Sequence, residues 1–163
     1  MIITLSKDEI RVCALIALER WLLKTDSVDQ PNYATGKAEG RLEHELLANI
    51  RANVIEYAVA KHYALPWTFP WYPSDQHPAR KDHPDVGTKV EVRSIRTATG
   101  IPVWQKDIDK QAIIVGGKAL NDNYTQVEIY GSLPAIQAQR DDWFDAKYNC
   151  WRIPLNALTP PKA

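Results

Sequence analysis

The stretch HPDVGTKVEVRSIR, residues 83–96, predicts a turn followed by a β-strand. Gly87 permits a tight turn or bulge, and the apolar and charged residues that follow alternate, which is typical of a half-buried β-strand. Because side chains at i and i+2 share one face of a strand, Glu91 and Arg93 are expected side by side. The turn can also bring the carboxylate of Asp85 against Glu91.

Two interpretations of these charges are open from the stretch alone. The first is a surface hairpin whose charged side chains face water. The second is a metal site, because Mg²⁺ takes hard oxygen ligands, and Asp85 and Glu91 would converge beside a cation. Features elsewhere in the chain are needed to distinguish the surface hairpin from the metal site.

Two helices are predicted before this stretch. Ser6 and Glu9 form a capping-box signature, and apolar residues then recur at helical spacing, which predicts a helix over 7–24. A second, longer helical pattern covers 38–63. Glu56 lies at the margin of its apolar stripe, at about 100° per residue, and is therefore placed to face the sheet from its edge.

Short strands are predicted after it. QAIIVGG at 111–117 is an apolar run ended by glycines, TQVEIYGSL at 125–133 alternates, and NCWRIPLNAL at 149–158 is expected to close the sheet. A short helix is expected over 134–143. This order predicts a single α/β (α+β) domain over 1–163, in which helices flank a central mixed sheet.

Composition excludes some classes of protein. The 163 residues carry no formal net charge, which gives no support to a strongly basic nucleic-acid binder. No stretch approaches the roughly 18 apolar residues of a membrane span. Cys13 and Cys150 suggest neither a disulfide framework nor a zinc site, so a soluble protein of a reducing cytoplasm is expected.

Five segments, in order, resemble the PD-(D/E)XK nuclease superfamily, in particular its small bacteriophage-type members: NVIEYAVAKHYALPW, HPDVGTKVEVRS, DIDKQAIIVGG, VEIYGSLPA and WRIPLNALTP. The resemblance implies a restriction-endonuclease-like core over 36–163, made of a helix and a mixed sheet with one crossover helix, after an extra N-terminal helix and linker at 1–35. It also implies hydrolysis of phosphodiester bonds, in DNA more than in RNA, in the cytoplasm of a bacterial host cell. A homodimer would add phosphate-binding surface to this neutral chain.

The resemblance also implies site residues. Glu56 matches the helix glutamate, Asp85 the aspartate of the PD element, and Glu91 the D/E position. These would hold Mg²⁺ or Mn²⁺, with the backbone carbonyl of Val92 as a further ligand. The catalytic set would be Asp85, Glu91 and Arg93, where Arg93 stands in place of the family's lysine.

That arginine opens an alternative. An ammonium can lose its proton in a buried site, whereas a guanidinium effectively cannot. Arg93 can position water and clamp a phosphate, leaving the metal to lower the pKa of the water. Lys89, which alternation places on the same face as Glu91, and Lys106, from the next loop, are candidates to replace the lysine. Otherwise the chain is a catalytically inactive nuclease-fold module that binds nucleic acid or protein.

Further residues are interpreted as contacts or packing. The candidate contacts to nucleic acid are Lys89, Arg96, Lys106, Arg80 and Lys81. Aromatic side chains in LPWTFPWYP can pack on the long helix or stack on bases; these are Trp67, Phe69 and Trp71. Asp107 and Asp109 are interpreted as helix-end or turn residues.

Overall fold

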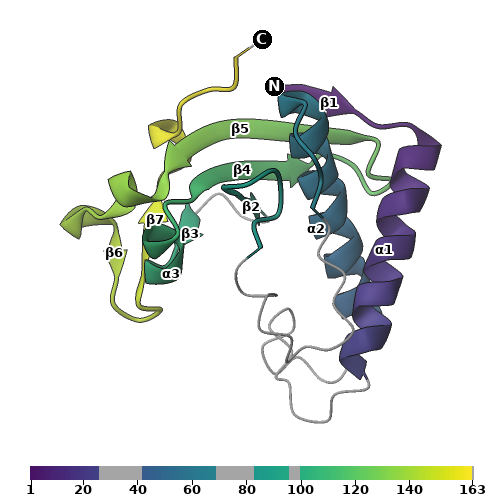
Figure 1. The fold of residues 1–163 in the computed structure, drawn as a ribbon, viewed down its shortest axis with the longest axis horizontal. Coiled ribbons are helices and arrows are strands. Elements are labelled where there is room, and N and C mark those ends of the chain that lie inside the picture. Colours follow the sequence, from purple (N-terminus) through teal and green to yellow (C-terminus); the bar gives the residue numbers. More distant parts are fainter. Residues whose placement is uncertain (26–41, 69–82, 96–99, 163) are drawn as a thin grey trace.

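The computed structural model describes residues 1–25, 42–68, 83–95 and 100–162 (Figure 1). Within them the α-helices are α1 (Lys7–Thr25), α2 (Leu42–Tyr63) and α3 (Gln105–Asp109). The strands are β1 (Ile2–Thr4), β2 (Val90–Ser94), β3 (Ile101–Val103), β4 (Ile113–Ala119), β5 (Gln126–Pro134), β6 (Phe144–Asp145) and β7 (Cys150–Ile153). Short 3-10 turns are η2 (Ala135–Ala138), η3 (Asp141–Trp143) and η4 (Leu155–Ala157). The predicted α/β fold class is confirmed.

The larger sheet is mixed, as predicted, with the strand order β1-β5-β4-β2. Strands β2 and β4 are parallel, and the other pairs are antiparallel. A parallel pair needs a crossover connection, and here the connection contains β3 and α3. Isolated antiparallel bridges from Trp67 to Val86 and from Val86 to Val90 extend the sheet beyond β2. The segment around Asp85 is therefore laid along the edge of β2.

The second sheet has three antiparallel strands in the order β3-β7-β6. The prediction that 149–158 closes the main sheet is therefore wrong, because β7 pairs with β3 and β6 instead. The short helix predicted over 134–143 is replaced by η2 and η3, which turn the chain out of β5. Figure 1 shows the second sheet and α3 at the opposite end of the molecule from α1.

The two long helices form where their sequence signals predict them. The capping box is present: Ser6 N–H donates to Glu9 Oε2 at 2.7 Å, and Glu9 N–H donates to Ser6 Oγ at 3.2 Å. Helix α2 is described from Leu42, and its predicted start at 38 lies outside the described residues. No helix in the described ranges is long and apolar enough to cross a lipid bilayer.

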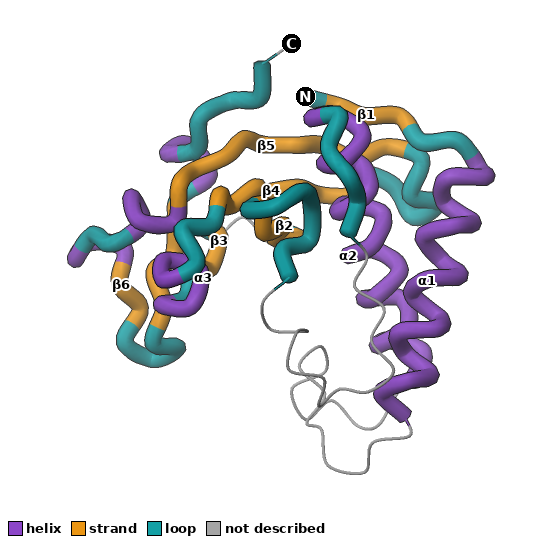
Figure 2. Tube along the Cα trace, viewed as in Figure 1, coloured by secondary structure: helices purple, strands orange, loops and turns teal. Residues whose placement is uncertain are grey.

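Apolar side chains form a core on each face of the main sheet. On one face α2 packs against the strands, with Val54, Ile55 and Val59 fully buried, and α1 packs on α2 (Figure 2). The other face packs against β3, β7 and α3. Neighbouring residues of β4 contribute to different cores. Val115 belongs to the core beneath α2, and Ile114 belongs to the core on the opposite face. The main sheet is thus covered on both faces, by helices on one and largely by the second sheet on the other.

Strand β4 runs on through the glycines that were expected to end it. A Cβ added to Gly117 would lie 2.6 Å from Ile55 Cγ2, and one added to Gly116 would clash with Ile101 Cδ1. The glycines let α2 and β3 approach the strand closely from opposite faces. They therefore mark close packing rather than a strand end.

Candidate metal centre

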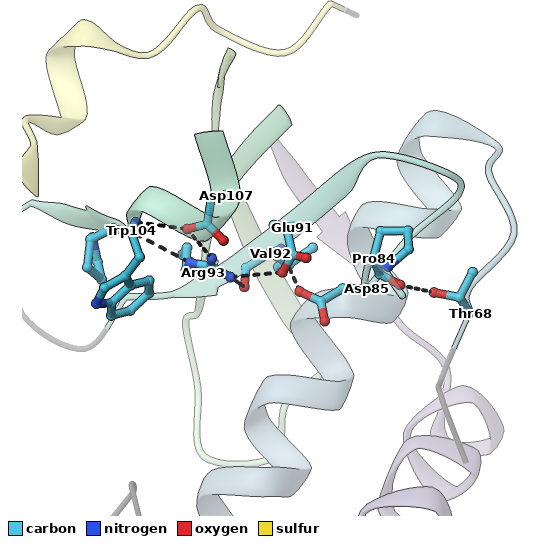
Figure 3. A network of polar contacts seen from close by, with 9 residues as sticks. Thr68, Pro84, Asp85, Glu91, Val92, Arg93, Trp104 and Asp107 are labelled. Atoms are coloured by element: carbon cyan, nitrogen blue, oxygen red, sulfur yellow. Dashed lines mark hydrogen bonds and ion pairs between the residues drawn. The ribbon is translucent and has the colours of Figure 1, made fainter. Parts of the chain in front are cut away.

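Three segments bring the predicted site residues to the edge of β2. Glu56 comes from α2. Glu91 lies in β2, and Asp85 lies on the segment beside it (Figure 3). The turn between the last two uses Gly87 at φ +58°, a left-handed conformation that favours glycine. Asp85 Oδ2 accepts the N–H of Val92 at 2.7 Å, a bond that fixes this carboxylate against the open edge of the strand.

The three carboxylates influence one another electrostatically. Burial raises the pKa of Asp85, and the charge of Glu56 raises it further, to about 7. Burial and then the charge of Asp85 raise the pKa of Glu91. Burial also raises the pKa of Glu56, and Glu91 adds to the rise. Each carboxylate therefore makes ionisation of another less favourable, as expected for acidic groups that share a partly dehydrated site.

Two arginines lie among these carboxylates but do not balance their charge. Arg20 Nη1 lies 3.4 Å from Glu56 Oε2, and Arg93 Nη1 lies 3.2 Å from Glu91 Oε2. Nη2 of Arg93 lies 2.8 Å from Oδ2 of a further carboxylate, Asp107. Among the described residues, four acidic groups thus share two guanidinium groups. A divalent cation would favour the ionised form of these carboxylates.

The donor set fits Mg²⁺ in part. In the described segments, no group of three His, Cys, Asp or Glu side chains is arranged to hold a metal ion. Mg²⁺ is commonly bound through one or two carboxylates while it keeps several waters. Asp85 and Glu91 are the pair that fits this pattern, because Oδ1 of Asp85 has no hydrogen bond among the described residues. The carbonyl of Val92 already accepts an N–H of Arg93 at 3.4 Å.

Glu56 is buried and hydrogen-bonded rather than solvated at the helix margin. Its side chain accepts the indole N–H of Trp67 at 3.2 Å, and the residue is 8% exposed. Arg20, which binds it, also donates to Asn53 Oδ1. The Trp67 ring packs edge-on against Tyr57, with the ring centroids 5.3 Å apart, so this tryptophan packs on the long helix. Sequence analysis missed Arg20, because its partners lie more than 30 residues away.

Arg93 is held by protein groups on several sides. Besides its two carboxylate partners, it donates from Nε to Pro102 O at 3.4 Å, and its guanidinium lies 5.2 Å from the Trp104 ring centroid. Asp107 is 1% exposed and also accepts the N–H of Trp104 at 3.0 Å. A bidentate grip on a phosphate would require Arg93 to release some of these partners.

The predicted nucleic-acid contacts are only partly described. Lys89 is exposed and lines a pocket with Glu91, in agreement with their expected common face. Lys106 is exposed, and its Nζ lies 5.7 Å from the Trp104 ring centroid, on α3. Five residues named in the sequence analysis lie outside the described part of the chain: Phe69, Trp71, Arg80, Lys81 and Arg96.

Comparison of the chain with protein-family models, curated proteins and solved structures finds no match. The interpretation of this centre therefore depends on the chemistry of its own side chains.

Asp85→Asn is expected to flatten the pH dependence of stability in the metal-free protein. Because the pKa of Asp85 is raised from 3.8 to about 7, the folded protein keeps a proton that the unfolded chain loses. The free energy of unfolding therefore falls as the pH rises between these values, and Asp85 contributes about 3 kcal/mol of this fall between about pH 5 and pH 8. Urea denaturation in EDTA at a series of pH values measures this change in the free energy of unfolding.

Asp142→Asn is the matched control for this experiment, because Asp142 is exposed. Glu56 and Glu91 also have raised pKa values, so some slope of the same sign should persist in Asp85→Asn. A slope as steep as that of the wild-type protein would contradict the prediction.

Proposed function

We propose that the protein is a metal-dependent nuclease that hydrolyses phosphodiester bonds, of DNA rather than RNA. The observation that carries the proposal is the centre formed by Glu56, Asp85 and Glu91, whose buried or partly buried carboxylates come from separate segments and raise one another's pKa. Such a centre suits a divalent cation and, with it, a phosphate.

The residues have different roles in this proposal. Asp85 and Glu91 would hold Mg²⁺ or Mn²⁺, and Glu56 would add negative charge from α2. The metal would lower the pKa of a bound water and stabilise the charge that develops on the phosphate. Because carboxylate ligands must be deprotonated, metal affinity is expected to rise with pH through the raised pKa of Asp85.

The contacts of Arg93 favour a role in positioning Glu91, because its N–H groups donate to Glu91 and also to Asp107 and Pro102. A guanidinium does not act as a general base, so activation of water would depend on the metal. The same contacts favour the second candidate function, an inactive nuclease-fold module that binds nucleic acid, since they keep Arg93 from clamping a phosphate.

Cleavage and binding assays separate the candidates. Purified protein is incubated with supercoiled, linear and single-stranded DNA and with RNA, in Mg²⁺, Mn²⁺ or EDTA. A nuclease is expected to cut DNA in the presence of either metal and to be inactive in EDTA. DNA retardation in gels without cleavage would support the inactive module, and the absence of both would contradict both candidates.

A further inference from the structure

A small pocket opens beside Glu91, and the proposed metal centre does not account for it. Its volume is about 170 Å³. The residues that line it are Pro84, Thr88, Lys89, Glu91, Lys110 and Ala112. The lining thus includes two lysines, a threonine and one glutamate.

The parallel pairing of β2 and β4 creates this pocket. Val90 lies opposite Ile113, so the two strands begin side by side, and Ile113 N–H donates to Lys89 O at 2.8 Å. Lys89 immediately precedes β2, and Lys110 caps the C-terminal end of α3, shortly before β4 begins. Two lysines that are 21 positions apart in the sequence therefore reach the same pocket.

We propose that this pocket binds a phosphate group, through Lys89 Nζ, Lys110 Nζ and the hydroxyl of Thr88. Ammonium groups are strong donors to phosphate oxygens and need no fixed fork geometry. Arg93 does not fill this role, because its guanidinium is held by Asp107 and Pro102. The pocket would therefore supply cationic contacts to phosphate that Arg93, held by these partners, does not.

The ligand is a phosphate of the nucleic-acid backbone, an identity that rests on the proposed function. The carboxylate of Glu91 opposes binding of an anion in the metal-free protein. A divalent cation bound by Glu91 and Asp85 reverses this effect, so phosphate and metal are expected to strengthen each other's binding. The pocket thus places a backbone phosphate next to the metal centre.

Titration of inorganic phosphate into ¹⁵N-labelled protein, in EDTA and again in Mg²⁺, at constant ionic strength, tests the pocket without catalysis. The amide signals of Thr88, Lys89 and Lys110 are expected to shift and to saturate together. Lys110→Gln and Lys89→Gln should each weaken binding about tenfold, the loss of one charge-assisted contact. Lys110→Arg keeps the charge and should retain binding. Retained binding would show that the weaker binding of Lys110→Gln does not come from misfolding.

Lys7→Gln is the matched control, since Lys7 is exposed at the start of α1 and outside the pocket. Phosphate binding that is absent in the wild-type protein, or unchanged in both pocket variants, would overturn the proposal. Failure of the proposed function has a different signature, which is lysine-dependent phosphate binding without metal-dependent cleavage of DNA.

Discussion

Glu91→Gln is expected to lower the rate of metal-dependent DNA cleavage by at least about a hundredfold, equivalent to about 2.7 kcal/mol of lost transition-state stabilisation. The amide keeps the size of the side chain but removes the negative charge that would hold the cation beside Asp85. Initial rates of plasmid cleavage at saturating Mn²⁺ measure the effect. Mn²⁺ affinity, measured separately by electron paramagnetic resonance, is expected to fall in parallel.

Glu19→Gln makes the same chemical change on the exposed surface of α1 and should leave cleavage unaltered. Circular dichroism of each variant establishes that the fold is retained. If Glu91→Gln cuts DNA at the wild-type rate, the centre at the edge of β2 is not the active site. Loss of cleavage with unchanged Mn²⁺ affinity would assign Glu91 a role other than metal binding.

Asp107→Ala is expected to lower the free energy of unfolding by about 3 kcal/mol. The substitution leaves the side chain of Arg93, 14% exposed, without its 2.8 Å partner, and removal of one member of a buried ion pair costs about 3–5 kcal/mol. It also removes the acceptor of the Trp104 N–H. Urea denaturation at neutral pH measures the change.

Two further variants make this result specific. Asp109→Ala alters an exposed aspartate of the same helix, whose bond to Gln105 is also exposed, and should change stability by less than about 0.5 kcal/mol. The double variant Asp107→Leu with Arg93→Met should recover most of the loss, because apolar groups can replace a buried ion pair at little cost. A single Asp107→Ala variant as stable as the wild-type protein would show that the pair contributes nothing.

Local signals predicted the elements that carry most of the candidate site. The capping box at Ser6 and Glu9 marks the start of α1, and alternation marks β2. The i, i+2 rule placed Lys89 and Glu91 on one face, and both line the same pocket. These features depend on residues close in sequence, which is why one chain was enough to predict them.

Contacts between residues that are distant in sequence could not be predicted from such local signals. Helix α3 has five residues, too few to show a helical period, and β3 has three. As a result, the burial of Asp107 and its bond to Arg93 had no local signal. The prediction that 149–158 closes the main sheet was wrong for the same reason, since alternation predicts a strand but does not identify the strand with which it pairs.

The chain passes back and forth between its two sheets. It forms β1 and β2 of the first, β3 of the second, β4 and β5 of the first, and then β6 and β7 of the second. Every single cut between β1 and β7 leaves at least one sheet divided, so neither sheet is a contiguous segment that can be excised whole. The two sheets are therefore expected to fold as one cooperative unit, and the edge of β2 depends on both of them for its shape.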